Sequence, residues 1–337
     1  MNDAKGNANA RTGDASRKGA MGTGNAGHFH HSPKRAHEGI TEALDDERTD
    51  VESPVMGRAP EADLTTAFVL GGGGVLGASE VGMLQALLEC NVHPDLIVGT
   101  SVGALNGAFI AADPTEAAVE GLRQGWVTLT ASEVFSGSLL SRVVSLARHG
   151  THLHDNEALR SFLDEALGGR AIEELVVRFE CVAASIERAE AHWFSQGPVV
   201  DAVLASCSVP GLLPPFRIGA EHFFDGGLVH SIPVSRAVAS GAKRIYVLHV
   251  GRIEQPLSVP TKPWEVALVS FEIARRHRFA EEMAALPPDV ELHLLPTGAA
   301  NTALANLRYR DTSRVERRIQ TAYEATHRYL SEHEQRR

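Results

Sequence analysis

The sequence predicts an α/β fold, a three-layer sandwich with a mainly parallel central sheet, and three observations support this prediction. From residue 65 onward, short apolar runs typical of buried strands alternate with helical patterns. Two of these runs pass directly into glycine-rich turns, at residues 71–77 and 99–103, where a strand would turn into a helix. A chain of 337 residues with 31 glycines and 43% apolar residues is long enough to bury one large core.

The chain divides into a predicted N-terminal tail, residues 1–63, and a predicted domain, residues 64–335. The tail is rich in Gly, Ala, Asn, His and charged residues and poor in aliphatic residues, so we expect it to be disordered. Basic side chains dominate its first 36 residues, and acidic side chains dominate the rest. A regulatory or partner-binding role for the tail is the alternative to a merely solvated segment.

The domain begins with a buried strand at 66–70 and a helix over 77–90, where Val81, Leu84 and Leu87 form an apolar face. A second strand, 95–99, precedes a helix over 102–112. Further helices are predicted over 116–127, 136–148, 155–167, 198–206, 263–285 and from 312. Further strands are predicted over 174–185, 191–195, 244–250 and 290–295, with a β-rich turn region at 216–225.

Composition and charge restrict the function classes. The net charge of −10 argues against a nucleic-acid-binding protein and against strong attraction to an anionic membrane. No apolar run approaches the 18 or more residues of a membrane span, and no secretory signal is expected. Cys90, Cys181 and Cys207 lack a metal-binding or redox spacing and are predicted to be reduced. We therefore expect a cytoplasmic location, with peripheral membrane contact left open.

Ser101 lies at the centre of a G-x-S-x-G pattern that Gly99 and Gly103 frame, directly after the apolar residues 96–98. Such a turn holds a serine on a sharp bend with its hydroxyl accessible, which suits a nucleophile. The alternative is structural, because Thr100 or Ser101 could cap the helix that follows.

The earlier glycine run offers a complementary site for negative charge. Unobstructed N–H groups of Gly72, Gly73 and Gly74 at a helix start could bind an oxyanion. Close packing of strand and helix is the simpler explanation. The run also matches the dinucleotide pattern G-x-G-x-x-G, but the end of the next strand lacks the acidic residue that binds the ribose. A P-loop is excluded because no Lys-Ser/Thr pair follows the glycines.

A third segment, far downstream, provides a candidate general base. Asp225 is followed by Gly226 and Gly227, which let the chain turn tightly and leave space above the carboxylate. A carboxylate in contact with a serine hydroxyl can orient it and accept its proton. Asp225 could instead only cap a tight turn.

With these three segments in order, residues 65 to 255 resemble the patatin-like phospholipases, serine acyl hydrolases with the pattern G-G-G-x-[KR]-G, G-x-S-x-G and D-G-[GA]. The resemblance implies a patatin-like fold and a Ser–Asp dyad of Ser101 and Asp225. It also implies oxyanion binding at Gly72–Gly74, a lipid ester substrate, and no metal or organic cofactor. One residue departs from the pattern: Leu76 stands where the family has Lys or Arg.

Two alternatives belong to other classes. An esterase for small soluble esters would use a Ser-His-Asp triad, and His249, His277 and His293 follow Ser101 and Asp225 in the order that such a triad needs. All three histidines fall inside predicted strands or helices, which disfavours this alternative. A non-catalytic lipid-binding or regulatory protein of the same fold is the other, and the intact serine and aspartate disfavour it.

Overall fold

The computed structural model describes residues 66–131, 156–210, 212–250, 256–261, 263–298 and 312–334. The predicted tail, residues 1–63, and the predicted helix over 136–148 lie outside these ranges. No helix in the described ranges is both long and apolar enough to cross a membrane.

One mixed sheet organises the described residues, in the strand order β5-β6-β3-β2-β1-β7-β8, with β4 paired to β3. Strands β3, β2, β1, β7 and β8 are parallel, whereas β4, β5 and β6 are antiparallel to their neighbours. The sheet is therefore mainly parallel, as predicted, and its parallel strands end at one edge. The strands are β1 (Thr66–Leu70), β2 (Leu96–Thr100), β3 (Arg178–Ser185), β4 (Glu190–Phe194), β5 (Phe216–Ile218), β6 (Glu221–Asp225), β7 (Arg244–Leu248) and β8 (Glu291–Leu294).

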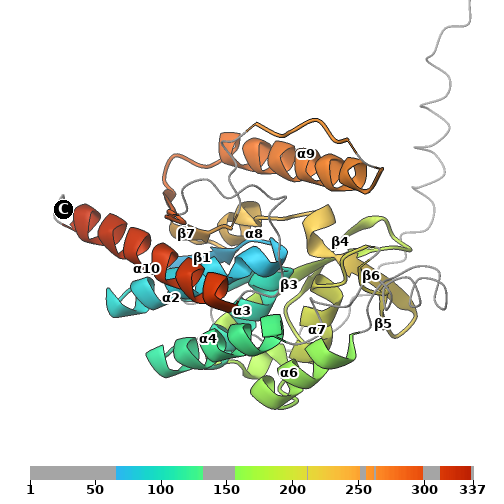
Figure 1. Ribbon diagram of the computed structural model, residues 1–337, viewed down its shortest axis with the longest axis horizontal. Helices are drawn as coiled ribbons and strands as arrows, with labels where there is room; N and C mark the ends of the chain where they lie inside the picture. The colour runs from blue at the N-terminus through green and yellow to red at the C-terminus, as the bar shows by residue number, and fades with distance from the viewer. Residues whose placement is uncertain are drawn as a thin grey trace, which may run out of the picture. The chain divides into compact units, whose positions relative to one another are not determined.

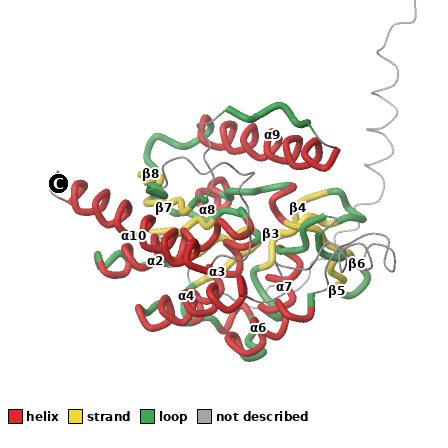
Figure 2. The backbone as a smooth tube through the Cα atoms, viewed as in Figure 1, coloured by secondary structure: helices red, strands yellow, loops and turns green. Residues whose placement is uncertain are grey.

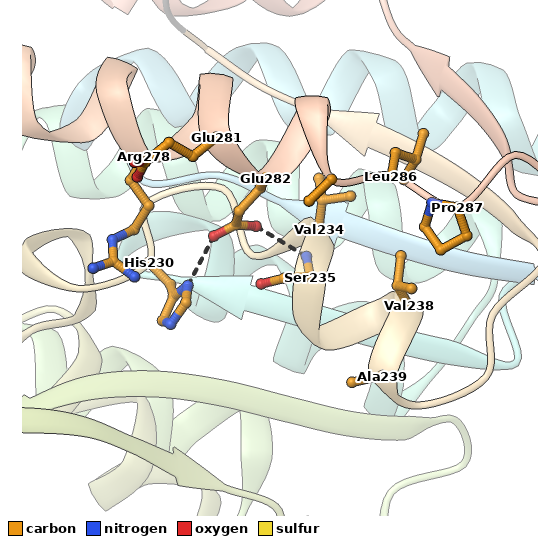
Figure 3. A pocket seen from close by; sticks show the side chains of 11 residues that line it. His230, Val234, Ser235, Val238, Ala239, Arg278, Glu281, Glu282, Leu286 and Pro287 are labelled. Atoms are coloured by element: carbon orange, nitrogen blue, oxygen red, sulfur yellow. Dashed lines mark hydrogen bonds and ion pairs between the residues drawn. The ribbon is translucent and has the colours of Figure 1, made fainter.

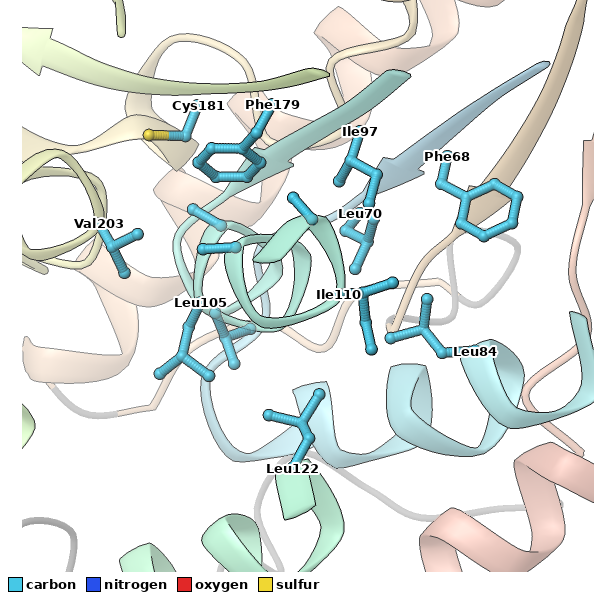
Figure 4. Packing of buried hydrophobic residues seen from close by; sticks show 14 of the residues in the cluster. Phe68, Leu70, Leu84, Ile97, Leu105, Ile110, Leu122, Phe179, Cys181 and Val203 are labelled. Carbon is cyan, nitrogen blue, oxygen red and sulfur yellow. The ribbon is translucent and has the colours of Figure 1, made fainter. Parts of the chain in front are cut away.

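Helices cover both faces of this sheet, as Figure 1 and Figure 2 show. On one face, Phe68, Leu70 and Ile97 pack in a cluster with residues of α2, α3, α4 and α7, as Figure 4 shows. Residues of α10 belong to the same cluster. On the other face, Ala67 and Val69 pack with residues of α8 and α9. The helices are α2 (Ala78–Glu89), α3 (Val102–Ala112), α4 (Glu116–Ala131), α6 (Glu157–Leu167), α7 (Val199–Ser206), α8 (Val234–Ala239), α9 (Pro263–Ala284) and α10 (Thr312–Glu334).

The central strands are apolar throughout because they are buried on both sides. All five residues of β1 and all five of β2 are buried, so neither strand shows the alternating pattern of a half-exposed sheet. Successive side chains of β1 reach opposite faces and join the two clusters. The prediction of a three-layer α/β sandwich is confirmed.

Two predicted elements differ from the structure. The strand predicted over 174–185 begins only at Arg178, because residues 172–174 form a short 3₁₀ helix. Helix α8, with six residues, was not predicted, since it is too short to show a helical period. None of the three cysteines forms a disulfide bond, which matches the prediction that they are reduced: Cys181 and Cys207 are buried, and Cys90 is half-buried.

Candidate active site

Ser101 occupies a strained turn between β2 and α3. Its φ of 54° and ψ of −126° are unusual for a residue with a side chain. Two glycines allow the turn by letting α3 approach the sheet closely. A Cβ atom on Gly103 would lie 2.4 Å from the carbonyl oxygen of Leu70, and one on Gly99 would lie 2.6 Å from Cα of Ala104. The fold therefore requires glycine on both sides of Ser101.

The hydroxyl of Ser101 does not cap the helix that it precedes. The capping interpretation of this residue is wrong, because Oγ donates a 2.5 Å hydrogen bond to Oδ2 of Asp225, 124 residues further along the chain. Both residues are almost fully buried, with 6% of Ser101 and 3% of Asp225 exposed. The structure thus brings together the two residues that the sequence proposes as nucleophile and base.

Asp225 is held at the end of β6 by its main chain and by both carboxylate oxygens. Its N–H donates to the carbonyl of Ser208 at 2.9 Å. Oδ1 accepts a 2.7 Å hydrogen bond from the N–H of Gly227, while Oδ2 accepts the one from Ser101. Asp225 therefore does cap the tight turn, as the structural alternative predicts. The cap uses only Oδ1, so Oδ2 can accept the hydrogen bond from Ser101. A Cβ atom on Gly226 would lie 2.1 Å from the carbonyl oxygen of Val182, so this turn requires glycine as well.

Burial changes the acid strength of Asp225. Loss of solvent raises its pKa from an ordinary value of 3.8 to about 6, although the hydrogen bonds from Ser101 and Gly227 act in the opposite direction. A carboxylate with a pKa near neutrality is a better proton acceptor than an exposed aspartate and still ionises at pH 7. The site thus contains a hydroxyl in direct contact with a carboxyl group whose pKa is raised.

Ser206, at the end of α7, supports the turn at Ser101 and was not anticipated. Its Oγ accepts a 2.8 Å hydrogen bond from the N–H of Ser101 and donates a 2.7 Å bond to the carbonyl of Val182 in β3. Ser206 is fully buried. In the sequence, Ser206 is only a serine at the end of an apolar helical segment. Its hydrogen-bond partner, Ser101, is 105 residues away, so the sequence gives no indication of this contact.

The glycine run lies beside Ser101. A Cβ atom on Gly72 would lie 3.3 Å from Cβ of Ser101. Gly73 and Gly74 are exposed, and no described residue accepts a hydrogen bond from their N–H groups. After Gly73 the chain forms a 3₁₀ turn over Gly74–Gly77, which leads into α2. These two N–H groups remain available to a ligand.

Gly72 has a different role from the one predicted. Its N–H donates a 2.9 Å hydrogen bond to the carbonyl of Ser231. The prediction that Gly72 is an oxyanion donor is therefore wrong: this N–H fastens the end of β1 to the segment before α8. Gly73 and Gly74 keep the availability that the prediction required.

The three histidines of the triad alternative lie in other environments. His277 is exposed on α9, near Glu281. His293, in β8, contacts the hydroxyl of Tyr329 at 3.1 Å. His249 is buried just after β7. Among the described residues, no histidine is hydrogen-bonded to Ser101 or Asp225.

A pocket of about 440 Å³ lies between α8 and α9, as Figure 3 shows. Mostly apolar side chains line it, and His230 forms part of its wall with a 2.9 Å contact from Nδ1 to Oε1 of Glu282. The carbonyl of His230 accepts a 2.7 Å hydrogen bond from Thr100, the residue before Ser101. Neither Ser101 nor Asp225 lines this pocket, so it is separate from the serine–aspartate pair.

Among the described residues, no group of three or more His, Cys, Asp or Glu side chains is arranged to hold a metal ion.

Comparison with known proteins finds a family that this chain matches. The family described as Patatin-like phospholipase matches residues 68–238. A patatin-like phospholipase domain-containing protein of Caenorhabditis elegans is 30% identical over 192 residues, which is 56% of this chain and 14% of that protein. A lysophospholipase of Emericella nidulans is 31% identical over 187 residues, 56% of this chain and 12% of that protein. The chain therefore spans only a small part of the length of these relatives.

Similar solved structures are more distant. The crystal structure of VipD from Legionella pneumophila gives a TM-score of 0.42 at 15% identity, covering 81% of this chain and 67% of that one. The human GIVD cytosolic phospholipase A2, in complex with methyl gamma-linolenyl fluorophosphonate, gives a TM-score of 0.39 at 14% identity, covering 80% and 58%.

The family match spans half of the sequence and includes the Ser101 turn, the glycine run and Asp225. The chain belongs to the patatin-like phospholipase family.

Proposed function

We propose that this protein hydrolyses carboxylic ester bonds of lipids through an acyl-serine intermediate, with Ser101 as nucleophile and Asp225 as base. The observation that carries the proposal is the 2.5 Å hydrogen bond from Ser101 Oγ to Asp225 Oδ2, on a strained turn in a buried site. A serine hydroxyl is a weak nucleophile unless a neighbouring base accepts its proton. Here the base is in direct contact and its pKa is raised to about 6.

Acylation follows from this contact. Ser101 Oγ attacks the ester carbonyl carbon while its proton passes to Asp225 Oδ2. The carbonyl oxygen becomes an oxyanion, which the N–H groups of Gly73 and Gly74 bind. The intermediate then collapses, the bond from carbon to the leaving alcohol oxygen breaks, and the alcohol leaves with the proton from Asp225. The positive φ of Ser101 fits the role of this turn as a nucleophile elbow.

Deacylation repeats the sequence with water. Asp225, ionised again, takes a proton from a water molecule, whose oxygen attacks the acyl carbon. Collapse of the second oxyanion breaks the bond to Ser101 Oγ, which recovers its proton from Asp225, and a carboxylic acid is released. No redox or metal-bound step is needed for this reaction.

The lipid class is proposed from the relatives. Several of them are named lysophospholipases or patatin-like phospholipase domain-containing proteins, so a phospholipid or a lysophospholipid is the substrate class to test first. Such substrates reside in membranes or micelles, and we accordingly propose peripheral contact with a lipid surface. We also propose that residues 64–335 form the catalytic domain and that the preceding residues are not needed for the chemical step.

The proposal is tested by measuring fatty acid release from a soluble ester, phosphatidylcholine and lysophosphatidylcholine. The wild-type protein should hydrolyse at least one of these, and Ser101→Ala and Asp225→Asn should not. Replacing the exposed Ser161 by Ala provides a matched serine control and should leave the rate unchanged. Alanine replacement of His249, His277 or His293 should keep the activity. A histidine variant as inactive as Asp225→Asn would favour the triad esterase instead.

A further inference from the structure

Arg318 on α10 contacts the loop that carries the proposed oxyanion donors. Its Nη1 donates a 3.2 Å hydrogen bond to the carbonyl oxygen of Val75, 243 residues earlier in the chain. Arg318 is half-buried, and among the described residues no carboxylate lies within ion-pair distance of its guanidinium. The acid two residues earlier, Glu316, is instead paired with Arg123 of α4. The positive charge of Arg318 is thus directed at a peptide carbonyl rather than neutralised.

This cation remains charged at neutral pH. Burial, and to a smaller extent the charge of Arg314 one turn earlier, lower the pKa of Arg318 below the ordinary value of an arginine. A guanidinium keeps its proton even so. Two arginines four residues apart on one helix repel each other, which is a small cost in helix stability.

The contacts of Arg318 link it to Gly74 through two peptide groups. The Val75 carbonyl that Arg318 binds belongs to the same peptide as the N–H of Leu76. That N–H donates a 3.2 Å hydrogen bond to the carbonyl of Gly73. The Gly73 carbonyl, in turn, belongs to the same peptide as the N–H of Gly74. In a planar trans peptide the N–H points away from the C=O. Fixing the first carbonyl therefore fixes the direction of the Gly74 N–H.

The same series carries an electrostatic effect. The two peptide dipoles lie head to tail, with the guanidinium at the carbonyl end and the Gly74 N–H at the other. A cation in this position polarises both peptides, and hydrogen bonds in series strengthen one another. The N–H of Gly74 becomes a stronger donor at the place where we propose that negative charge develops. Leu76, within the loop itself, contributes no charge of its own.

We propose that Arg318 is a positioning residue for the oxyanion site, which orients and polarises the Gly74 N–H through the Val75–Leu76 and Gly73–Gly74 peptides. The inference rests on the proposed function, because it assigns to Gly74 the binding of an oxyanion. It places part of the catalytic apparatus on α10, after the end of the segment that the family match covers.

The test compares Arg318→Met, which removes charge and donor, with Arg318→Lys, which keeps the charge. Arg317→Met, at an exposed neighbour on the same helix, is the control. Each full-length variant is measured for kcat and KM on a soluble nitrophenyl ester, for thermal stability, and for hydrogen–deuterium exchange of residues 71–77. We expect Arg318→Met to lower kcat by about tenfold, less than the roughly 10²–10³-fold cost of deleting an oxyanion donor. KM should change little, and the Arg318→Lys variant should keep most of the wild-type rate. Hydrogen–deuterium exchange of residues 71–77 should rise only in Arg318→Met.

The outcomes are distinguishable. A wild-type kcat in Arg318→Met overturns the inference while leaving the proposed function intact. The inference is also overturned if Arg318→Lys and Arg318→Met lose the same amount of rate and the same amount of thermal stability. That pattern would mean that Arg318 contributes only to packing. Unchanged exchange in residues 71–77 refutes the anchoring whether or not the protein is active. If exchange rises but the wild-type protein hydrolyses no ester, the proposed function fails and the anchoring stands.

Discussion

The N–H of Ser101 donates a hydrogen bond to Oγ of Ser206, and the Ser206 hydroxyl donates one to the carbonyl of Val182. One buried side chain thereby joins the turn after β2 to the neighbouring strand β3. Because Ser101 has an unfavourable φ of 54°, its backbone needs such support. The conformation that presents the hydroxyl to Asp225 thus depends on a residue to which the proposed mechanism assigns no chemical step.

Replacing Ser206 by alanine should lower both stability and turnover. It leaves one buried N–H and one buried carbonyl without their partner, which costs about 1–3 kcal/mol in the free energy of unfolding. We expect kcat to fall further than the fraction of folded protein, because the Ser101 turn relaxes. Urea unfolding and ester kinetics measure the two effects. Thr326→Ala removes another fully buried hydroxyl, one bonded to the carbonyl of Pro296, and should cost stability without a loss of kcat in the folded fraction.

The rate should depend on pH through Asp225. The base must be ionised, and burial raises its pKa to about 6, so kcat/KM should rise with pH and level off above about pH 7. A pH–rate profile on a neutral soluble ester, between pH 4 and 9, checks this. A half-maximal rate near pH 4 would mean that Asp225 has the acidity of an exposed aspartate and that the site is more hydrated than the structure indicates.

Asp225→Asn should lower activity by about 10²–10⁴-fold, the usual contribution of a general base, and yet stabilise the fold at neutral pH. The pKa of Asp225 is higher in the folded protein, about 6, than its ordinary 3.8, so the folded state binds the proton more tightly. The stabilising contribution of Asp225 is therefore fully present below about pH 4 and is lost as the pH rises through about 6. This loss lowers the free energy of unfolding by roughly 3 kcal/mol. Asparagine has no such titration and can keep the hydrogen bond from Gly227. The difference in unfolding free energy between variant and wild type, at pH 4.5 and at pH 8, should increase with pH; a constant difference would contradict it.

Gly73 and Gly74, the proposed oxyanion donors, should respond differently to alanine. At Gly74 no atom lies within 4 Å of an added Cβ, but its φ of 55° is unfavourable for alanine, by about 1–2 kcal/mol. Gly74→Ala should therefore lower kcat by distorting the proposed donor while the fold survives. At Gly73 an added Cβ would lie 1.8 Å from Cγ2 of Val250, so Gly73→Ala should lower stability as well.

Gly121→Ala is the control for these two variants. Gly121 is exposed on α4, with open space around an added Cβ, so alanine should raise stability by about 0.5–1 kcal/mol and leave kcat unchanged. Thermal unfolding and ester kinetics of the three variants test the set. Normal turnover in Gly74→Ala would show that the oxyanion donors lie elsewhere.

The sequence predicted those features that depend on local pattern. Strands β1 and β2 are short apolar runs that end in glycine turns, and both are present as expected. The pairing of Ser101 with Asp225 was implied by the resemblance to the patatin-like phospholipases, because both residues match motifs of that family. The long helices α9 and α10 were predicted near their observed bounds from their helical patterns.

What the sequence could not predict depends on contacts between distant segments. The N–H of Gly72 is taken by Ser231, and nothing near either residue indicates this bond. Ser206 lies at the end of α7 and Arg318 lies within α10. In the sequence, both look like ordinary residues of a helix. Their roles become visible only once the fold places α7 and α10 beside the two turns.

The most direct test of the central claim is the identity of the residue that a fluorophosphonate modifies. The wild-type protein should carry one adduct, which peptide mass spectrometry locates at Ser101. The rate of labelling should fall by about 10²–10⁴-fold in Asp225→Asn, the usual contribution of a general base, and Ser101→Ala should not be labelled. An adduct at another serine, or undiminished labelling of the Asp225→Asn variant, would contradict the Ser101–Asp225 dyad.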